Sequence, residues 1–157
     1  MAEDAPAAAA CEVWFYHLET TGLDQALPEL LEKTLQRGWR ALVRTTASER
    51  VERLDGWLWS YRDDSFLPHA PSDDPAAARQ PILLTTEDGN PNAANALFLI
   101  DGAEPDALDD YSRCVVLFDG GDDDQLRNAR GLWSAVKGRG HPVSYWRQQG
   151  GRWEKQA

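Results

Sequence analysis

Short apolar runs and stretches of helical periodicity alternate near the start of the chain. The run "VWFYHL" (13–18) is rich in strand-forming residues, and turn-type residues follow it. Leucines and alanines then recur at helical spacing and predict a helix over about 26–37. Pro28 fits this helix only if it lies in the first turn, where its missing N–H costs nothing.

A second strand and a second helix follow directly. The segment "WRALVRTT" (39–46) has strand character. Thr46 and Glu49 have the spacing of a capping box, which would begin a helix that runs through about Ser60. Strand, helix, strand, helix is the order that builds a parallel sheet with helices packed against it.

The second half of the chain predicts further strands and one long helix. Residues 70–81 have the composition of a surface linker. Continuous apolar character, as in strands buried on both faces of a sheet, marks three runs: "ILLTT" (82–86), "ALFLID" (96–101) and "CVVLFD" (114–119). A helix over about 122–138 and a closing pair of strands around 149–151 complete the pattern. We therefore expect an α/β fold with three layers, an open, mostly parallel sheet flanked by helices.

Length and composition indicate one domain. The 157 residues are 42% hydrophobic and 27% charged, and no apolar run approaches the roughly 20 residues that cross a bilayer. We expect a disordered lead-in over 1–11, which lacks the basic start of a secretory signal, and a single domain over 12–157. The two cysteines, Cys11 and Cys114, adjoin strand-like runs and indicate buried free thiols, which favours a cytoplasmic protein.

Charge divides the chain into an acidic body and a basic end. The net charge is −10, which argues against broad binding of phosphate backbones. Residues 125–157 nevertheless carry seven basic residues and one acidic residue, a net charge of +6. This segment predicts a local site for an anionic partner, and direct binding of nucleic acid by it is the alternative.

Aromatic residues concentrate near the end of the second predicted helix. A helical stripe predicted to face the core is formed by Val51, Leu54, Trp57, Leu58 and Tyr61. Trp59 falls on the opposite face, and three residues of a non-helical segment follow it closely: Phe66, Leu67 and Pro68. Exposed tryptophan is typical of protein-binding anchors, so these four residues are a candidate interface. The alternative is that Trp59 packs beneath the following loop.

The last predicted helix combines an apolar stripe with a basic edge. Trp133 belongs to the stripe, and Arg130 and Lys137 lie beside it at i−3 and i+4, with Arg127 one turn earlier. Such an edge could hold a peptide with a hydrophobic, carboxylate-bearing end, the arginine binding the charge and the aromatic residue the side chain. The alternative is that the arginines are solvated and only their stems cover the core.

Catalytic and cofactor motifs are missing from the sequence. The strand-to-helix turn "GGDDD" has three aspartates that would repel phosphate and fits a helix cap. Asp119 and these aspartates lack the spacing of a calcium loop, and the three histidines have no partner at ligand spacing. We expect no metal, no cofactor and no catalytic activity; a metal-dependent enzyme that uses Asp119 is the alternative.

Several motifs, taken together and in order, resemble the chi subunit of the bacterial DNA polymerase III holoenzyme. The resemblance covers about residues 13 to 154 and rests on "FYHL" (15–18), "LDGWLW" (54–59), "SFLPH" (65–69), "PILLT" (81–85), "VVLFD" (115–119), "AR" (129–130), "GH" (140–141) and "YW" (145–146). It implies an α/β fold similar to that of nucleotide-binding proteins, without their phosphate loop.

The resemblance also implies a function and two partners. The protein would be a non-catalytic accessory subunit of the clamp-loader complex in DNA replication, paired one to one with the psi subunit and touching DNA only indirectly. It would bind the acidic, phenylalanine-ended C-terminal tail of single-stranded DNA-binding protein (SSB). By analogy, the tail site comprises Arg127, Arg130, Trp133 and Lys137, and the psi interface comprises Trp59, Phe66, Leu67 and Pro68.

Overall fold

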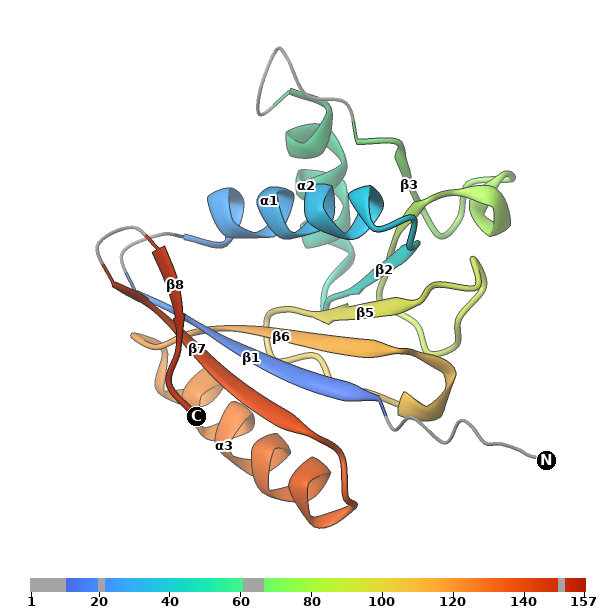
Figure 1. The fold of residues 1–157 in the computed structure, drawn as a ribbon. Helices are drawn as coiled ribbons and strands as arrows, with labels where there is room; N and C mark the ends of the chain where they lie inside the picture. The colour runs from blue at the N-terminus through green and yellow to red at the C-terminus, as the bar shows by residue number, and fades with distance from the viewer. Residues whose placement is uncertain (1–10, 20–21, 61–66, 150–151) are drawn as a thin grey trace, which may run out of the picture.

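One twisted sheet forms the centre of the computed structural model, which describes residues 11–19, 22–60, 67–149 and 152–157 (Figure 1). Its eight strands lie in the order β3-β4-β2-β5-β6-β1-β7-β8. The strands are β1 (Glu12–Leu18), β2 (Ala41–Arg44), β3 (His69–Pro71), β4 (Ile82–Thr85), β5 (Ala96–Leu99), β6 (Arg113–Asp119), β7 (Val143–Gln149) and β8 (Arg152–Lys155). The helices are α1 (Leu23–Gln36), α2 (Ser48–Ser60) and α3 (Asp123–Gly138), and two short 3₁₀ turns cover Ala77–Arg79 and Leu108–Asp110.

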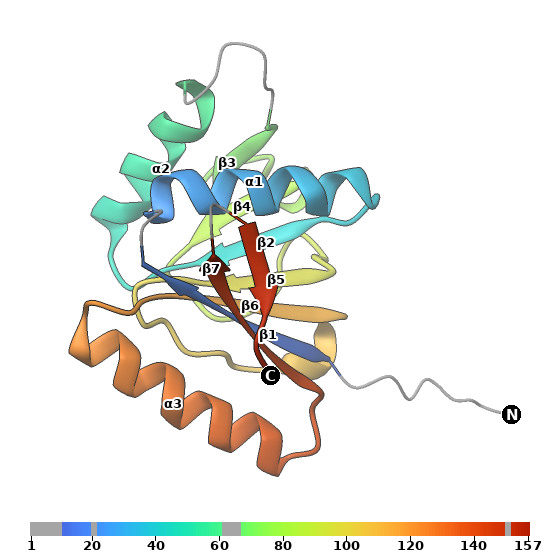
Figure 2. The same cartoon turned by 60° about the vertical axis from the view of Figure 1, so that its left-hand side comes forward.

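The pairing confirms the expected α/β architecture. Neighbouring strands are parallel except at the β7–β8 edge, which is the closing hairpin predicted around 149–151. Helices α1 and α2 cover one face of the sheet and α3 covers the other, so both faces of the central strands are buried (Figures 1 and 2). The continuous apolar runs of the sequence follow from this double covering.

Strand β3 was missed in the segment assigned as a linker. It is three residues long and lies at the sheet edge against β4, where Pro71 needs no ladder partner. A short edge strand that contains proline has the composition of a loop.

Helix α1 starts earlier than its periodicity predicts, and Trp57 donates a hydrogen bond to a backbone carbonyl that would otherwise lack its helical donor. The helix begins at Leu23, so Pro28 lies well inside it and cannot donate to the carbonyl of Asp24 four residues earlier. The indole N–H of Trp57 donates to that carbonyl instead, at 2.6 Å. The prediction that Trp57 belongs to the core was wrong: it is 36% exposed and bridges α2 to α1. Tyr61 lies outside the described residues.

The predicted capping box of α2 was also wrong. Ala47 provides the carbonyl that accepts the first helical bonds, from the N–H groups of Arg50 and Val51. The helix therefore begins at Ser48, which places Thr46 outside the cap position and Glu49 too early to reach back.

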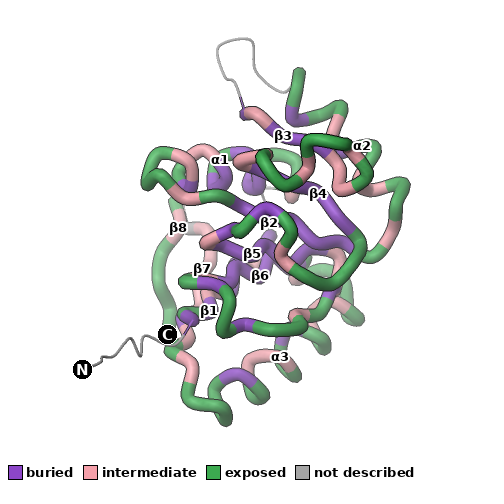
Figure 3. Tube along the Cα trace, turned by 90° about the vertical axis from the view of Figure 1, so that its right-hand side faces the viewer, coloured by how far each residue is buried: buried purple, intermediate pink, exposed green. Residues whose placement is uncertain are grey.

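The sheet separates two apolar clusters, visible as buried strands between more exposed helices (Figure 3). Strand β1 contributes to both, because successive side chains of a strand point to opposite faces. Phe15 packs on the α3 side, and Tyr16 packs on the side of α1 and α2. Both cysteines are buried and free, as predicted, and burial raises the pKa of Cys11 to about 12, which leaves its thiol protonated and unreactive.

Candidate functional site

A groove of about 470 Å³ opens between α3 and the strands β1 and β7. The two strands pair in parallel with Phe15 opposite Tyr145 and His17 opposite Arg147, so these four side chains share the α3 face. Helix α3 supplies the other wall with its apolar stripe. The residues that line the groove are Phe15, His17, Phe118, Leu126, Ala129, Arg130, Trp133, Ser134, Tyr145 and Arg147.

Residues with aromatic rings make up half of those that line the groove. Trp133 packs edge-on against Phe15, with ring centroids 5.3 Å apart, and less closely against Tyr145 at 6.5 Å. His17 lies against Phe118 at 5.0 Å. Phe15 is buried and Trp133 is half-buried, so a fixed ring supports a partly accessible one. Edge-to-face packing of this kind leaves ring faces for a further apolar group.

His17 holds one side of the groove in place. Its Nδ1 lies 2.6 Å from the hydroxyl of Tyr145, and burial lowers the pKa of His17, which favours the neutral ring. Gly120 follows β6 at this point, and a Cβ built on it would overlap the His17 ring. The glycine is therefore required by close packing and not by a phosphate.

Two arginines stand at the rim of the groove in different states. Arg130 is exposed and makes no ion pair with any described residue. Arg147 binds the carboxylate of Glu19 with two hydrogen bonds, of 3.0 and 2.6 Å. A planar guanidinium that is not already paired is the better hydrogen-bond donor to an incoming carboxylate, so Arg130 is the candidate anchor.

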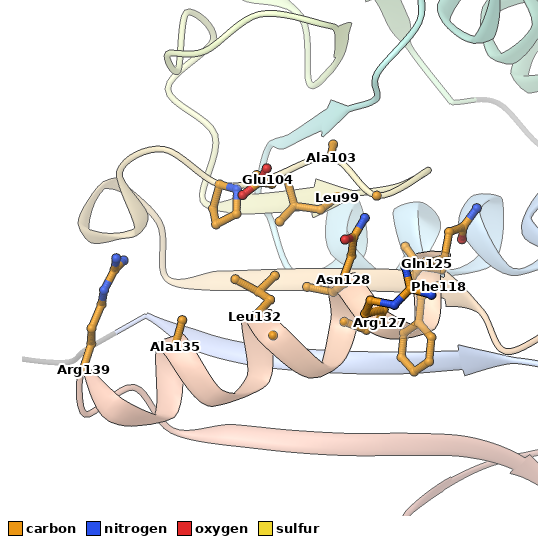
Figure 4. A pocket seen from close by; sticks show the side chains of 16 residues that line it. Leu99, Ala103, Glu104, Phe118, Gln125, Arg127, Asn128, Leu132, Ala135 and Arg139 are labelled. Carbon is orange, nitrogen blue, oxygen red and sulfur yellow. The ribbon is translucent and has the colours of Figure 1, made fainter. Parts of the chain in front are cut away.

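The other predicted tail residues lie at different distances from this groove. Lys137 lies one turn beyond Trp133 and two turns beyond Arg130, with its Nζ 6.0 Å from the centroid of the Trp133 ring. Arg127 pairs with Asp124 at 3.1 Å and lines a second cavity of about 340 Å³, on the opposite edge of α3 with Asn128 and Arg139 (Figure 4). The structure thus brings Arg130, Trp133 and Lys137 together and sets Arg127 apart.

Sequence reasoning missed the strand half of the groove. Phe15 and His17 alternate along one run, and Tyr145 and Arg147 alternate along another. Alternation therefore groups these residues only in two separate pairs. It does not indicate that β1 and β7 are neighbours, since 124 or more residues separate them. The four residues can be assigned to one site only when the pairing of β1 with β7 is known.

The predicted psi surface lies at the end of α2. Trp59 is 52% exposed, and its ring stacks on His69 with centroids 4.3 Å apart. His69 is buried and fixed by the carbonyls of Leu67 and Asp55, at 2.5 and 2.9 Å from its ring nitrogens. Leu67 is buried, so its side chain anchors the segment and leaves the surface to Trp59 and the half-buried Pro68. Phe66 lies outside the described residues.

The turn after β6 has the structure of a helix cap, as predicted. The carboxylate of Asp122 accepts hydrogen bonds from the N–H groups of Asp124 and Gln125, and that of Asp119 accepts from Gly121. The N–H groups that a phosphate would need are therefore bound within the chain. The described residues contain no group of three or more His, Cys, Asp or Glu side chains placed to hold a metal ion. They also contain no helix long and apolar enough to span a membrane.

Comparison with known proteins finds a matching family and two similar proteins. The family model described as "DNA polymerase III chi subunit, HolC" matches residues 11–144. A protein of Rickettsia prowazekii (strain Madrid E), described as "Probable DNA polymerase III subunit chi", is 35% identical over 85 residues, or 54% of this chain. A "DNA polymerase III subunit chi" of Pseudomonas aeruginosa is 27% identical over 93 residues, or 59% of this chain.

The alignments span 52% of the Rickettsia protein and 64% of the Pseudomonas protein, which is less than two thirds of each relative. The family match is broader, since it runs from the start of the described residues into β7 and includes Phe15, Arg130 and Trp133. The eight-stranded α/β fold and this match lead to one conclusion: the chain belongs to the family of DNA polymerase III chi subunits.

Proposed function

We propose that the groove beside α3 binds the acidic, phenylalanine-ended C-terminal tail of SSB, and that the Trp59 surface joins the psi subunit of the clamp loader. The observation that carries the proposal is an arginine at the rim of an aromatic groove, Arg130, which forms no ion pair within the described part of the chain. The family match supplies the setting, a subunit of a replicative polymerase.

The chemistry of such a tail matches the two halves of the groove. A terminal phenylalanine ring would pack against Trp133 and Phe15, and the terminal carboxylate would accept hydrogen bonds from Arg130. Acidic residues before the terminus would lie in the field of Lys137 and of the basic segment 125–157, whose net charge is +6. Affinity should therefore fall with added salt.

Calorimetric titration with a synthetic tail peptide tests the proposal. Wild-type protein should bind at micromolar strength, about −8 kcal/mol, and Arg130→Ala should weaken binding at least about tenfold because the charge-assisted bonds are lost. Arg127→Ala is the matched control: it removes the same charge from the same helix, but from the edge that faces the second cavity. Equal losses in the two variants, or a folded wild type that does not bind, would contradict the proposed site.

The psi half of the proposal rests on the exposure of Trp59. Its ring is held by His69 on a rigid element, as expected of an anchor that keeps its shape when free. Trp59→Ala together with Phe66→Ala should abolish co-purification with psi and leave the melting temperature nearly unchanged. A large drop in melting temperature would instead make these side chains part of the core.

Two modest contacts would then suffice for function without any bond being broken. Attachment to psi fixes the protein on the clamp loader, and the groove captures the tail of a protein that already coats the template strand. Linking two weak contacts raises the effective concentration of each for the other, so their combined strength exceeds either alone.

A further inference from the structure

The opposite face of β1 and β7 carries an aromatic and basic surface that the tail site does not use. Two hollows adjoin there, of about 500 and 200 Å³, and both are lined by Trp14 and Trp146. The larger lies under the C-terminal end of α1 and the smaller reaches β8 at Lys155. We call the two hollows together the indole groove.

The rings of the indole groove are close to parallel. Trp14 and Trp146 stack with centroids 5.2 Å apart and planes inclined by 24°, and Trp146 continues onto Tyr16 at 5.9 Å and 8°. Their indole N–H groups are bound within the chain, to Glu12 and Ser144, so the ring planes are fixed. The rings cover one another in part, and Trp14 and Trp146 remain half-buried, so their accessible portions can extend the stack to another flat ring, such as a nucleobase.

A guanidinium group is built into this stack. Arg113 lies over the ring of Trp14, 3.8 Å from its centroid, and over Trp39 at 5.2 Å. Its Nε is buried and has no hydrogen-bond partner among the described residues, and its nearest acidic partner, Glu12, is 3.6 Å away. The side chain of Arg113 is 18% exposed, and a planar guanidinium fixed between two rings can bind an oxyanion at that exposed part.

The charges along the indole groove have one dominant sign. Of the described residues that line it, Glu12 alone is acidic, and the cations are Lys33, Arg37, Arg113 and Lys155. The pKa of Arg113 lies below its ordinary value because of burial and then because of the positive charge of Arg37. A bound anion would offset both effects.

From these features we propose that the indole groove binds a single strand of DNA. Bases stack on the accessible faces of the tryptophans and phosphates lie on Arg113 and its neighbouring cations. The two hollows continue on both sides of the Trp14–Trp146 pair, so the surface is longer than one nucleotide and favours a strand over a free mononucleotide. The site is separate from the tail groove, since the sheet lies between them. DNA binding at this site would depend little on the basic segment 125–157, because Lys155 is the only cation of that segment that lines the indole groove.

Fluorescence anisotropy with a labelled oligothymidine of about 15 nucleotides at low salt tests the proposal. The double variant Lys33→Glu and Arg37→Glu should weaken binding at least about tenfold. Arg127→Glu and Arg139→Glu form the matched control, because all four residues are exposed and both pairs change the net charge equally. The control should weaken binding by less than about threefold. Equal weakening in the two pairs would mean unspecific attraction and would overturn the proposal, as would a wild type that does not bind.

A second arm tests the stacking. A strand of the same length without bases should bind about tenfold more weakly than oligothymidine, because only the phosphates remain to be bound. Equal binding of the two strands would exclude base stacking and overturn the proposal. Titration of the same variants with the tail peptide separates the two sites: Lys33→Glu with Arg37→Glu should leave peptide binding unchanged, and Arg130→Ala should leave DNA binding unchanged.

Discussion

Strands β1 and β7 present two different surfaces, one on each side of the sheet. On the α3 side, a helix covers the strands and leaves a groove between Trp133 and the strand side chains. On the other side, the C-terminal end of α1 covers only part of the strands, and the indoles of Trp14 and Trp146 stack on each other. The same alternation of side chains thus yields a groove along a helix on one face, and a stacked ring surface beside the end of a helix on the other.

The two surfaces also hold their charges differently. The groove beside α3 has an unpaired arginine at its rim and a second one, Arg147, bound to Glu19. The indole groove has Arg113 within its ring stack, near Glu12. Each surface therefore combines an aromatic wall, cations and one carboxylate of the chain itself, which competes with an anionic ligand for the arginine that it pairs with.

The largest expected difference between the two faces is in stability. Phe15→Ala removes a fully buried ring from the α3 side and should lower the free energy of unfolding by about 3–5 kcal/mol. Trp14→Ala removes a half-buried ring and its stacking partners, for an expected loss of about 1–2 kcal/mol. Urea denaturation of both variants measures the difference. Equal losses would show that the indole surface is an ordinary part of the core.

A smaller loss is expected when the close packing at His17 is disturbed. Gly120→Ala places a methyl group against the His17 ring and should cost about 1–3 kcal/mol and weaken binding of the tail peptide severalfold. Gly131→Ala is the control: its Cβ meets nothing, it lies on α3 beside the second cavity and outside the groove, and alanine should stabilise α3 by about 0.5–1 kcal/mol. Thermal melts and peptide titration report both quantities. Unchanged peptide affinity in Gly120→Ala would remove His17 from the site.

Release of the paired arginine should improve binding modestly. Glu19→Gln frees Arg147 for an incoming carboxylate, so we expect tail affinity to rise about twofold to threefold. Stability should barely change, because solvent screens an exposed ion pair and the ordering of its two long side chains opposes the attraction. Glu12→Gln makes the matched change on the opposite face and should strengthen binding of oligothymidine and not of the peptide. Calorimetric titration measures the affinity of each variant for the peptide and for oligothymidine. A fall in tail affinity in Glu19→Gln would contradict a competing role for this carboxylate.

The smallest expected effect is a pH dependence confined to the α3 side. Burial lowers the pKa of His17 in the folded protein, against the opposing influence of Glu19 and Asp119. As the pH falls below about 6.5, the unfolded chain therefore takes up the proton more readily, and the free energy of unfolding decreases. The decrease between about pH 7.5 and 5.5 should be smaller in His17→Gln than in the wild type. Identical pH profiles would exclude the histidine as the cause.

Much of the fold could be predicted because it depends on local patterns. The continuous runs at β4, β5 and β6 and the aspartates before α3 each carry their own signal. The errors at Pro28 and Trp57 occurred where a distant residue decides: Pro28 is tolerated inside α1 because Trp57 donates to the freed carbonyl of Asp24, and this contact draws Trp57 out of the core.

The candidate site was likewise predictable only where its residues are close together in the sequence. Arg130, Trp133 and Lys137 lie on one helix, so helical spacing groups them. Their partners Phe15, His17 and Tyr145 come from strands at opposite ends of the chain, and only the sheet order brings them to the helix. Arg127 was grouped with the others by spacing, but the angular step between successive turns carries it to the second cavity.

The most direct test of the central claim uses the seven tryptophans as reporters of the two faces. In a nitrogen-15 NMR titration with the SSB tail peptide, the indole N–H signal of Trp133 should shift progressively and saturate at micromolar affinity. The signals of Trp14, Trp39 and Trp146, on the other side of the sheet, should stay in place. Shifts of these three with an unchanged Trp133 signal would contradict a tail site beside α3.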